Sequence, residues 1–238
     1  MAASDERLRR RREVVLGYRI FGAFRWGDMG DGHISARDPE RPDCFWLLRG
    51  GVSFDRAELD DLVLVGPDGE VLEGRGPYNV TAHRIHWPIH EARPDVVAAA
   101  HTHTPWGTPF AAERRLLAPI TQEACYFFDD HALFDDEEVQ VLSTEGGKRI
   151  AAALGPNRGV ILANHGLLTV GASVAESIAA FVLMERVAEA HLKAPGFRPI
   201  SAASARVAKD GLEPPLSLPA AFAHLVARHV PELTGWVD

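Results

Sequence analysis

The stretch Val96-Val97-Ala98-Ala99-Ala100-His101-Thr102-His103 indicates how this chain folds and where its chemistry lies. It is a short apolar run without a helical period and follows the turn-forming residues Arg93-Pro94-Asp95, so it predicts a buried strand. In a strand, side chains two positions apart point to the same face, roughly 6 to 7 Å from each other. His101 and His103 are therefore expected to converge on one point.

A second apolar stretch, Val160-Ile161-Leu162-Ala163-Asn164-His165-Gly166, supplies the best candidate for a third imidazole. It reads as another strand that ends at Asn-His-Gly, where Gly166 would permit a sharp turn. Three histidines that leave one position open are typical of a catalytic zinc-type site rather than a closed structural one. The alternative is that each is an ordinary half-buried strand histidine, but the spacing and the matching second strand favour metal ligation.

Length, composition and charge limit the class of protein. With 238 residues and 46% hydrophobic content, the chain is expected to form a single domain, 1–238, that ends in a helical tail at 196–238. The charged start and the lack of an apolar run near 18 residues predict no signal peptide or membrane segment, and hence a cytoplasmic protein. The net charge of −8 argues against a nucleic-acid partner. Cys44 and Cys125 have no motif spacing and are expected to be reduced thiols.

Hydrophobic periodicity and turn signals predict the remaining elements. The basic run Arg9–Arg12 is expected on a solvated face of the first helix, and Thr81 is expected to cap the second. The acidic run Asp135–Glu138 is interpreted as a helix start. The loop Gly27–Arg37 could cradle a carboxylate or phosphate, or could simply be a turn. Helices are predicted at 5–24, 82–91, 109–114, 146–154, 174–193 and 220–229, and strands at 45–48, 60–65 and 71–73.

Two further groups are candidates for chemistry. His83, His86 and His90 share one face of the second helix, so they form either a rival metal platform or a plain polar stripe, with His86 favoured as a hydrogen-bond donor behind the strand histidines. Glu123 has apolar neighbours that could desolvate it and raise its pKa toward a general acid or base role. An exposed surface acid is the alternative for Glu123.

Several motifs in this order resemble the class II aldolase/adducin family over about residues 10–195. They are Gly32-His33-Ile34-Ser35-Ala36-Arg37, Leu62-Val63-Leu64-Val65, Glu91-Ala92-Arg93-Pro94-Asp95-Val96, His101-Thr102-His103-Thr104 and Asn164-His165-Gly166-Leu167-Leu168-Thr169-Val170-Gly171. The resemblance implies a three-layer α/β/α sandwich around a mainly antiparallel sheet, and a C4 homotetramer with the active site between subunits. It also implies a divalent metal on His101, His103 and His165, usually zinc, with manganese, cobalt or iron in some members.

The chain departs from the family's sugar-phosphate aldolases at the catalytic glutamate, which lies eleven residues before the arginine of Arg-Pro-Asp and is Ala82 here. The phosphate-binding serines before it become Val80 and Thr81, and the Asn of the family's Gly-Asn-x-Ser loop becomes His33. The pattern is closer to the adducin-like subgroup. The runs Ile120–Ala124 and Asp129–His131 are similar to a branch that includes decarboxylases and the non-haem iron oxygenase of aminocoumarin antibiotic biosynthesis.

These features predict a metal-dependent carbon–carbon lyase, an aldolase or decarboxylase, for a small 2-oxo or hydroxy acid. Cleavage beside a carbonyl leaves an enolate, which a cation stabilises and an acid/base protonates. With Ala82 in place of the glutamate, Glu123 is nominated as acid/base first, and His33 or His86 second. Loss of carbon dioxide tolerates Ala82 better than aldol cleavage does. The alternatives are an iron oxygenase of an aromatic 2-oxo or 2-hydroxy acid and a non-catalytic adducin-like scaffold.

Overall fold

The computed structural model describes residues 3–136, 138–212 and 217–237, which form an α/β fold around one eight-stranded sheet. The strand order is β4-β3-β2-β1-β5-β8-β7-β6, and every neighbouring pair is antiparallel except β6 and β7. The predicted mainly antiparallel sheet is confirmed. The strands are β1 Gly32–Arg37, β2 Phe45–Leu48, β3 Leu62–Val65, β4 Val71–Glu73, β5 Ala98–Thr102, β6 His131–Phe134, β7 Gly159–Leu162 and β8 Gly166–Gly171.

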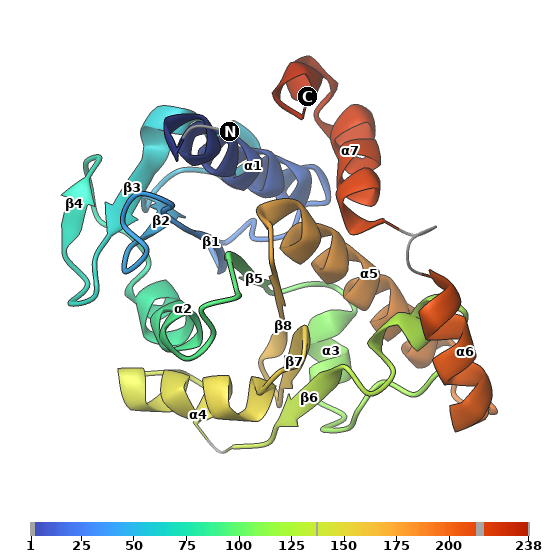
Figure 1. Cartoon of the computed structure of the whole chain (residues 1–238). Helices are drawn as coiled ribbons and strands as arrows, with labels where there is room; N and C mark the ends of the chain where they lie inside the picture. Colours follow the sequence, from blue (N-terminus) through green and yellow to red (C-terminus); the bar gives the residue numbers. More distant parts are fainter. Residues whose placement is uncertain (1–2, 137, 213–216, 238) are drawn as a thin grey trace.

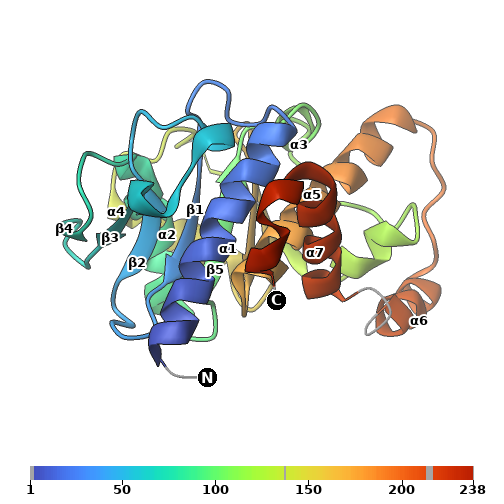
Figure 2. The same cartoon turned by 90° about the horizontal axis from the view of Figure 1, so that it is seen from above.

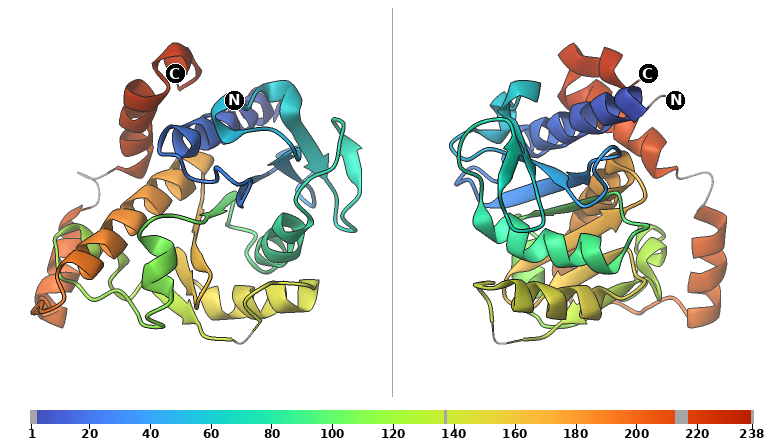
Figure 3. Two further views of the ribbon diagram at one scale, coloured as in Figure 1. Left: turned by 180° about the vertical axis from the view of Figure 1, so that it is seen from behind. Right: turned by 60° about the vertical axis from the view of Figure 1, so that its left-hand side comes forward.

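Helices cover both faces of this sheet, which confirms the three layers (Figure 1). One layer contains α1 and α5, with α7 packed outside them, and the other contains α2 and α4, as the turned views also show (Figures 2 and 3). The short α3 and the outlying α6 complete the set. The helices are α1 Ala3–Ala23, α2 Val80–Ala92, α3 Gly107–Ala111, α4 Thr144–Leu154, α5 Val174–Lys193, α6 Ala202–Leu212 and α7 Leu218–His229.

The alternation of side chains along β5 decides which layer the histidines face. Ala98 and Ala100 belong to the core beneath α1 and α5, whereas Ala99 belongs to the core beneath α2 and α4. Because side chains alternate between faces, His101 lies on the same face as Ala99. The β1 register pairs His33 with His101 and Ser35 with Ala99, so β1 presents both residues to α2 as well.

Local hydrogen bonds explain where the helices differ from prediction. Gly32–Arg37 is a strand rather than part of a loop, and Asn79 rather than Thr81 caps α2, accepting a hydrogen bond from the Thr81 N–H at 3.0 Å. The predicted helix at 109–114 lies at Gly107–Ala111, and Arg114, at φ 51°, is outside the helical range. Helix α6 was not predicted.

The acidic run at 135–138 does not begin a helix, so that prediction is wrong. Residue 137 lies outside the described residues; α4 begins at Thr144, with the Ser143 hydroxyl accepting from the Gly146 N–H. Asp136 and Glu138 instead accept hydrogen bonds from Arg149 of α4. These carboxylates tie the preceding loop to the helix.

The basic run on α1 is not a solvated face. Arg7, just before it, binds Asp38 at 2.6 Å and Glu73 at 2.7 Å, and the guanidinium of Arg11 lies 4.5 Å from the centre of the Trp46 ring. These contacts hold α1 against the strands, so the arginines act within the fold. Both cysteines are free and buried, as predicted. None of the described helices is long and apolar enough to cross a membrane.

Candidate metal centre

Strand β5 and the turn between β7 and β8 bring the three predicted ligands together. The ligand nitrogens of His101, His103 and His165 lie within 4.8 Å of one another. The left-handed conformation of the β7–β8 turn falls on Asn164, at φ 58°, rather than on Gly166. Asn tolerates this conformation better than most residues, so the Asn-His dipeptide itself makes the turn.

Contacts at Nδ1 indicate which nitrogen of two of these rings is available. The Nδ1 atom of His101 lies 2.7 Å from the carbonyl oxygen of Leu167, and Nδ1 of His103 lies 3.2 Å from Oδ2 of Asp31. The carbonyl accepts a hydrogen bond, so Nδ1 of His101 carries the proton and Nε2 keeps its lone pair. The Asp31 carboxylate likewise favours the proton of His103 on Nδ1 and leaves Nε2 for a cation. Metal-binding histidines commonly have such partners on the nitrogen that does not bind the metal.

The protonation state of the rings also suits a cation. Burial, followed by the neighbouring histidines, holds the pKa of His101 well below its usual value. Burial and the nearby His103 lower the pKa of His165 to about 4. Neutral imidazole is the form that binds metals, so these residues fit a divalent cation. Metal binding itself stays a prediction.

The three histidines open onto a cavity of about 390 Å³. Its wall also contains His33 of β1, Asn79 and Thr81 at the start of α2, and the apolar residues Val139 and Val141. Such a volume suits a small molecule. Asp31 is the only acidic side chain among the described residues that line this cavity, and it is bound to His103.

The remaining predicted histidines separate into different roles. His86 is fully buried behind His33 and contacts it, with His33 Nδ1 and His86 Nε2 2.8 Å apart. His83 contacts the carbonyl oxygens of Gly66 and Pro67 instead. His90 binds Ser35. Among the described residues, the helix histidines therefore form no metal group of their own.

Glu123 lies away from this cavity. It begins the 3-10 helix Glu123–Phe127, its side chain is exposed, and it lines a different surface hollow together with Arg186 and Lys193. Of the two alternatives for Glu123, the structure shows the exposed acid, because the apolar neighbours in sequence, Ala124 to Phe127, turn into the core and leave the carboxylate outside. Ala82 is buried against Phe45 and Val63.

Sequence reasoning missed two carboxylates that support the site. Asp31 was hidden in a glycine-rich loop, although an acid next to a strand that pairs with the His101 strand was a usable signal. Glu185 of α5 is buried and accepts hydrogen bonds from the Thr104 hydroxyl at 2.6 Å and from the Trp106 N–H at 2.9 Å. Burial raises the pKa of Glu185. Glu185 stabilises the loop that follows His103. The sequence pattern of the long helix α5 does not distinguish this glutamate from the others.

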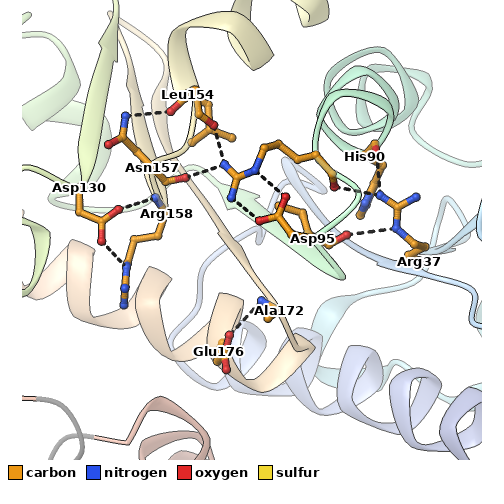
Figure 4. Close-up of polar contacts among 12 residues, drawn as sticks. Arg37, His90, Asp95, Asp130, Leu154, Asn157, Arg158, Ala172 and Glu176 are labelled. Atoms are coloured by element: carbon orange, nitrogen blue, oxygen red, sulfur yellow. Dashed lines mark hydrogen bonds and ion pairs between the residues drawn. The ribbon is translucent and has the colours of Figure 1, made fainter.

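A second hollow, of about 530 Å³, lies at the other end of β5 and β8, where Ala98 pairs with Gly171. Figure 4 shows that its charged groups bind one another: Arg158 contacts Asp130 at 2.7 Å, and Glu176 accepts from the Ala172 N–H at 2.9 Å. Arg93 likewise pairs with Asp95. The concentration of imidazoles, not the larger hollow, therefore marks the candidate site.

The fold and the histidine cluster define a class: an α/β sandwich with a three-histidine centre at one end of its sheet. The sequence matches the model of the class II aldolase and adducin N-terminal domain over residues 12–192, so the chain belongs to this family. The match covers the sheet, both helical layers and all three histidines.

The named relatives of this chain have names that describe different activities. Decarboxylase NovR from Streptomyces niveus is 37% identical over 207 residues, which cover 86% of this chain and 71% of that protein. The 4-hydroxy-3-prenylphenylpyruvate oxygenase/4-hydroxy-3-prenylbenzoate synthase from Streptomyces roseochromogenus subsp. oscitans is 39% identical, covering 74% of this chain and 65% of that protein. The solved L-fuculose 1-phosphate aldolase from Glaciozyma antarctica PI12 superposes with a TM-score of 0.84 at 30% identity, covering 98% of this chain and 94% of that one.

Proposed function

We propose that this protein is a divalent-metal-dependent carbon–carbon lyase for a small 2-oxo or hydroxy acid, with decarboxylation favoured over aldol cleavage. The observation that supports it is the cluster of three imidazoles, two of them with a partner at Nδ1, at the wall of a cavity of about 390 Å³. One relative is named a decarboxylase, and another is named an oxygenase of a phenylpyruvate, which is a 2-oxo acid. Both names agree with a 2-oxo acid substrate.

His101, His103 and His165 would hold the cation through ring nitrogens, and zinc is the ion we expect, with manganese, cobalt or iron as alternatives. When bound, the cation would supply a positive charge that stabilises negative charge on a substrate oxygen. His33 is close enough to the ligands to contact the same substrate, since its ring centre lies 5.0 Å from that of His101.

The preference for decarboxylation follows from the carboxylates. Aldol cleavage needs a base for the substrate hydroxyl, whereas loss of carbon dioxide does not. Among the described lining residues, only Asp31 is acidic, and it is bound to His103. Ala82 and the exposed Glu123 supply no base to this cavity.

The test compares His103→Ala with His224→Ala, which alters an exposed histidine on α7. Each protein is purified without added metal, analysed for metal content and assayed on a panel of 2-oxo acids, hydroxy acids and aldol donors for carbon dioxide, aldehyde and oxygen uptake. We expect His103→Ala to lose metal and activity with an unchanged circular dichroism spectrum. A His103→Ala protein that keeps its metal, or a wild type that binds no divalent ion, would refute the proposal.

An iron oxygenase is the second candidate, because one relative at 39% identity has oxygenase in its name. Three imidazoles also suit Fe(II). Iron in the purified protein with oxygen consumption on an aromatic 2-oxo acid would favour this function. Zinc or manganese with carbon dioxide release and no oxygen uptake would favour the lyase. A non-catalytic adducin-like scaffold would show no activity on this panel with any of these metals.

We also propose that the chain assembles into a homotetramer with the cavity at a subunit interface, as the family resemblance implies. Exposed apolar side chains near the cavity support contact with another copy: Val80 at the start of α2 is 51% exposed, Val139 46% and Leu142 61%. Exposed apolar groups that lie together are typical of interaction surfaces.

A further inference from the structure

A row of hydrogen-bonded side chains runs from the cavity into the core, and we name it the histidine–serine chain: His33, His86, Ser35 and His90. His33 Nδ1 lies 2.8 Å from His86 Nε2, His86 Nδ1 lies 2.7 Å from Ser35 Oγ, and Ser35 Oγ lies 2.9 Å from His90 Nε2. All four side chains are buried, with 4% exposure at most. Strand β1 contributes His33 and Ser35 on one face, and α2 contributes His86 and His90 one turn apart.

The direction of the hydrogen bonds along this chain is set by its inner end. A neutral imidazole has one N–H donor and one acceptor nitrogen, and the buried Ser35 hydroxyl has no hydrogen-bond partner among the described residues except His86 and His90. Because its single O–H must then donate to one of these two rings, all three contacts run in the same sense. At the inner end, Nδ1 of His90 is buried and has no hydrogen-bond partner among the described residues. A buried N–H without a partner is rarer than an acceptor without one. His90 Nδ1 is therefore the bare acceptor, and its proton lies on Nε2.

The surroundings of His90 agree with this assignment. The Val96 carbonyl is near enough to this ring to favour its charged form, but it makes no hydrogen bond of ordinary geometry with Nδ1. Its hydrogen bond comes from Arg37 Nε, at 3.1 Å. Arg37 also donates to the His90 carbonyl at 2.6 Å, so a positive charge lies beside the ring. Figure 4 shows this contact. A neighbouring cation favours a lone pair over a further N–H.

The protons then follow in order toward the cavity. His90 Nε2–H donates to Ser35 Oγ, the Ser35 hydroxyl donates to His86 Nδ1, and His86 Nε2–H donates to His33 Nδ1. The proton of His33 consequently lies on Nε2. No hydrogen bond joins that nitrogen to any part of the chain that the structure describes, and the His33 ring lines the cavity.

We propose that His33 presents a neutral Nε2–H donor to an oxygen of the substrate, and that Ser35, His86 and His90 are positioning residues that fix this tautomer. His101 has the opposite tautomer, with its Nδ1–H donating to the Leu167 carbonyl, and the Asp31 carboxylate favours the same tautomer for His103. The same residue type thus serves two purposes: a bare nitrogen toward a cation, and an N–H toward negative charge that forms on a substrate oxygen. The role toward substrate rests on the proposed function, whereas the tautomer does not.

Nuclear magnetic resonance tests the tautomer directly. The metal-free protein, with ¹⁵N-labelled histidine, is examined near neutral pH by long-range ¹H–¹⁵N correlation, and signals are assigned with single His→Gln variants. We expect the Nε2–H form for His33, His86 and His90, and the Nδ1–H form for His101 in the same spectrum as an internal reference. The Nδ1–H form at His33 or His86 would overturn the inference, because His33 would then present a bare nitrogen.

A matched pair of variants tests the donor in zinc-loaded protein. Oxalate, which resembles the enolate of a 2-oxo acid, is titrated by calorimetry into wild type, His33→Gln and His33→Leu. Glutamine keeps an N–H donor and leucine does not, so we expect oxalate affinity to fall about 10- to 100-fold in His33→Leu and less than about 5-fold in His33→Gln. Equal losses in the two variants would overturn the donor role. A wild type that takes up no zinc or no oxalate would count against the proposed lyase. The resonance measurement of the His33 tautomer would still test the hydrogen-bond order along the histidine–serine chain.

Ser35 is tested against a serine of similar burial. The Ser177 hydroxyl donates to the Thr169 carbonyl at 3.1 Å on the α5 side of the sheet, so Ser177→Ala removes a comparable buried hydrogen bond. We expect Ser35→Ala to weaken oxalate binding with zinc affinity unchanged, Ser35→Thr to restore it, and Ser177→Ala to leave it as in wild type. Indistinguishable behaviour of Ser35→Ala and Ser177→Ala would show that Ser35 is only structural.

Discussion

Replacing Asp31 with Ala should weaken zinc binding about tenfold, although Asp31 would not touch the metal. Its Oδ2 atom lies 3.2 Å from Nδ1 of His103, so the carboxylate favours a proton on that nitrogen and leaves Nε2 for the cation. Loss of such a partner typically costs 10- to 100-fold in metal affinity. The side chains of His103 and Asp31 are 41% and 32% exposed, so water screens their interaction and the lower limit applies, about 1.4 kcal/mol.

Competition with a chromophoric zinc chelator near neutral pH measures this change. Asp31→Asn keeps an oxygen that accepts from Nδ1–H, so its loss should be smaller, about threefold. Asp28→Ala is the matched control, because Asp28 lies in the same loop and pairs only loosely, at 3.6 Å, with the exposed Arg25. Wild-type affinity in Asp31→Ala, or an equal loss in Asp28→Ala, would refute the reasoning.

Three further predictions concern other parts of the molecule. Glu123→Gln should leave turnover and metal content unchanged, since this side chain is exposed and outside the cavity; a large fall in turnover would return it to the site. Acid should destabilise the fold: burial, then the nearby Arg37, lowers the pKa of His90 to about 3, so the unfolded chain binds a proton that the folded one does not. This contribution to stability is complete above about pH 6.5 and is lost as the pH falls toward 3, at about 1.4 kcal/mol per pH unit. The urea midpoint of the wild type should therefore fall as the pH is lowered, and the midpoint of His90→Gln should fall less steeply. Equal slopes for the two proteins would contradict this prediction. Val80→Asp with Leu142→Asp should dissociate the assembly in light scattering, whereas Val207→Asp on α6, at 73% exposure, should not; an unchanged mass in the double variant would move the interface elsewhere.

The positions of the three metal-site histidines were predictable because they depend on local pattern. The apolar run before His101 makes a strand, and the two-residue period of a strand places His103 on the same face. The Asn-His-Gly turn after a second apolar run brought His165 to the same region. The replacement of the family's glutamate by Ala82 was equally predictable, because its position is found by counting residues back from Arg93.

The exposure of the Glu123 carboxylate has a physical reason that the sequence did not show. Whether the apolar residues next to Glu123 enclose its carboxylate depends on which way the 3-10 helix turns, and this helix directs Ala124 to Phe127 inward and Glu123 outward. Apolar neighbours in sequence do not report the direction of a side chain. The same uncertainty hid Glu185, whose carboxylate meets the loop after His103 from a helix about 80 residues later.

The sequence by itself determined the sandwich, the strand that bears His101 and the residue types of the candidate metal centre, because hydrophobic period and turn chemistry are properties of neighbouring residues. Only the tertiary structure decided what each imidazole presents to the cavity. The proton of a ring lies where its other nitrogen finds a partner, and those partners come from distant segments: Leu167 for His101, Asp31 for His103, and α2 for His33. Contacts with distant segments therefore give His33 a donor and leave His101 and His103 a nitrogen for a cation, a distinction that no local pattern contains.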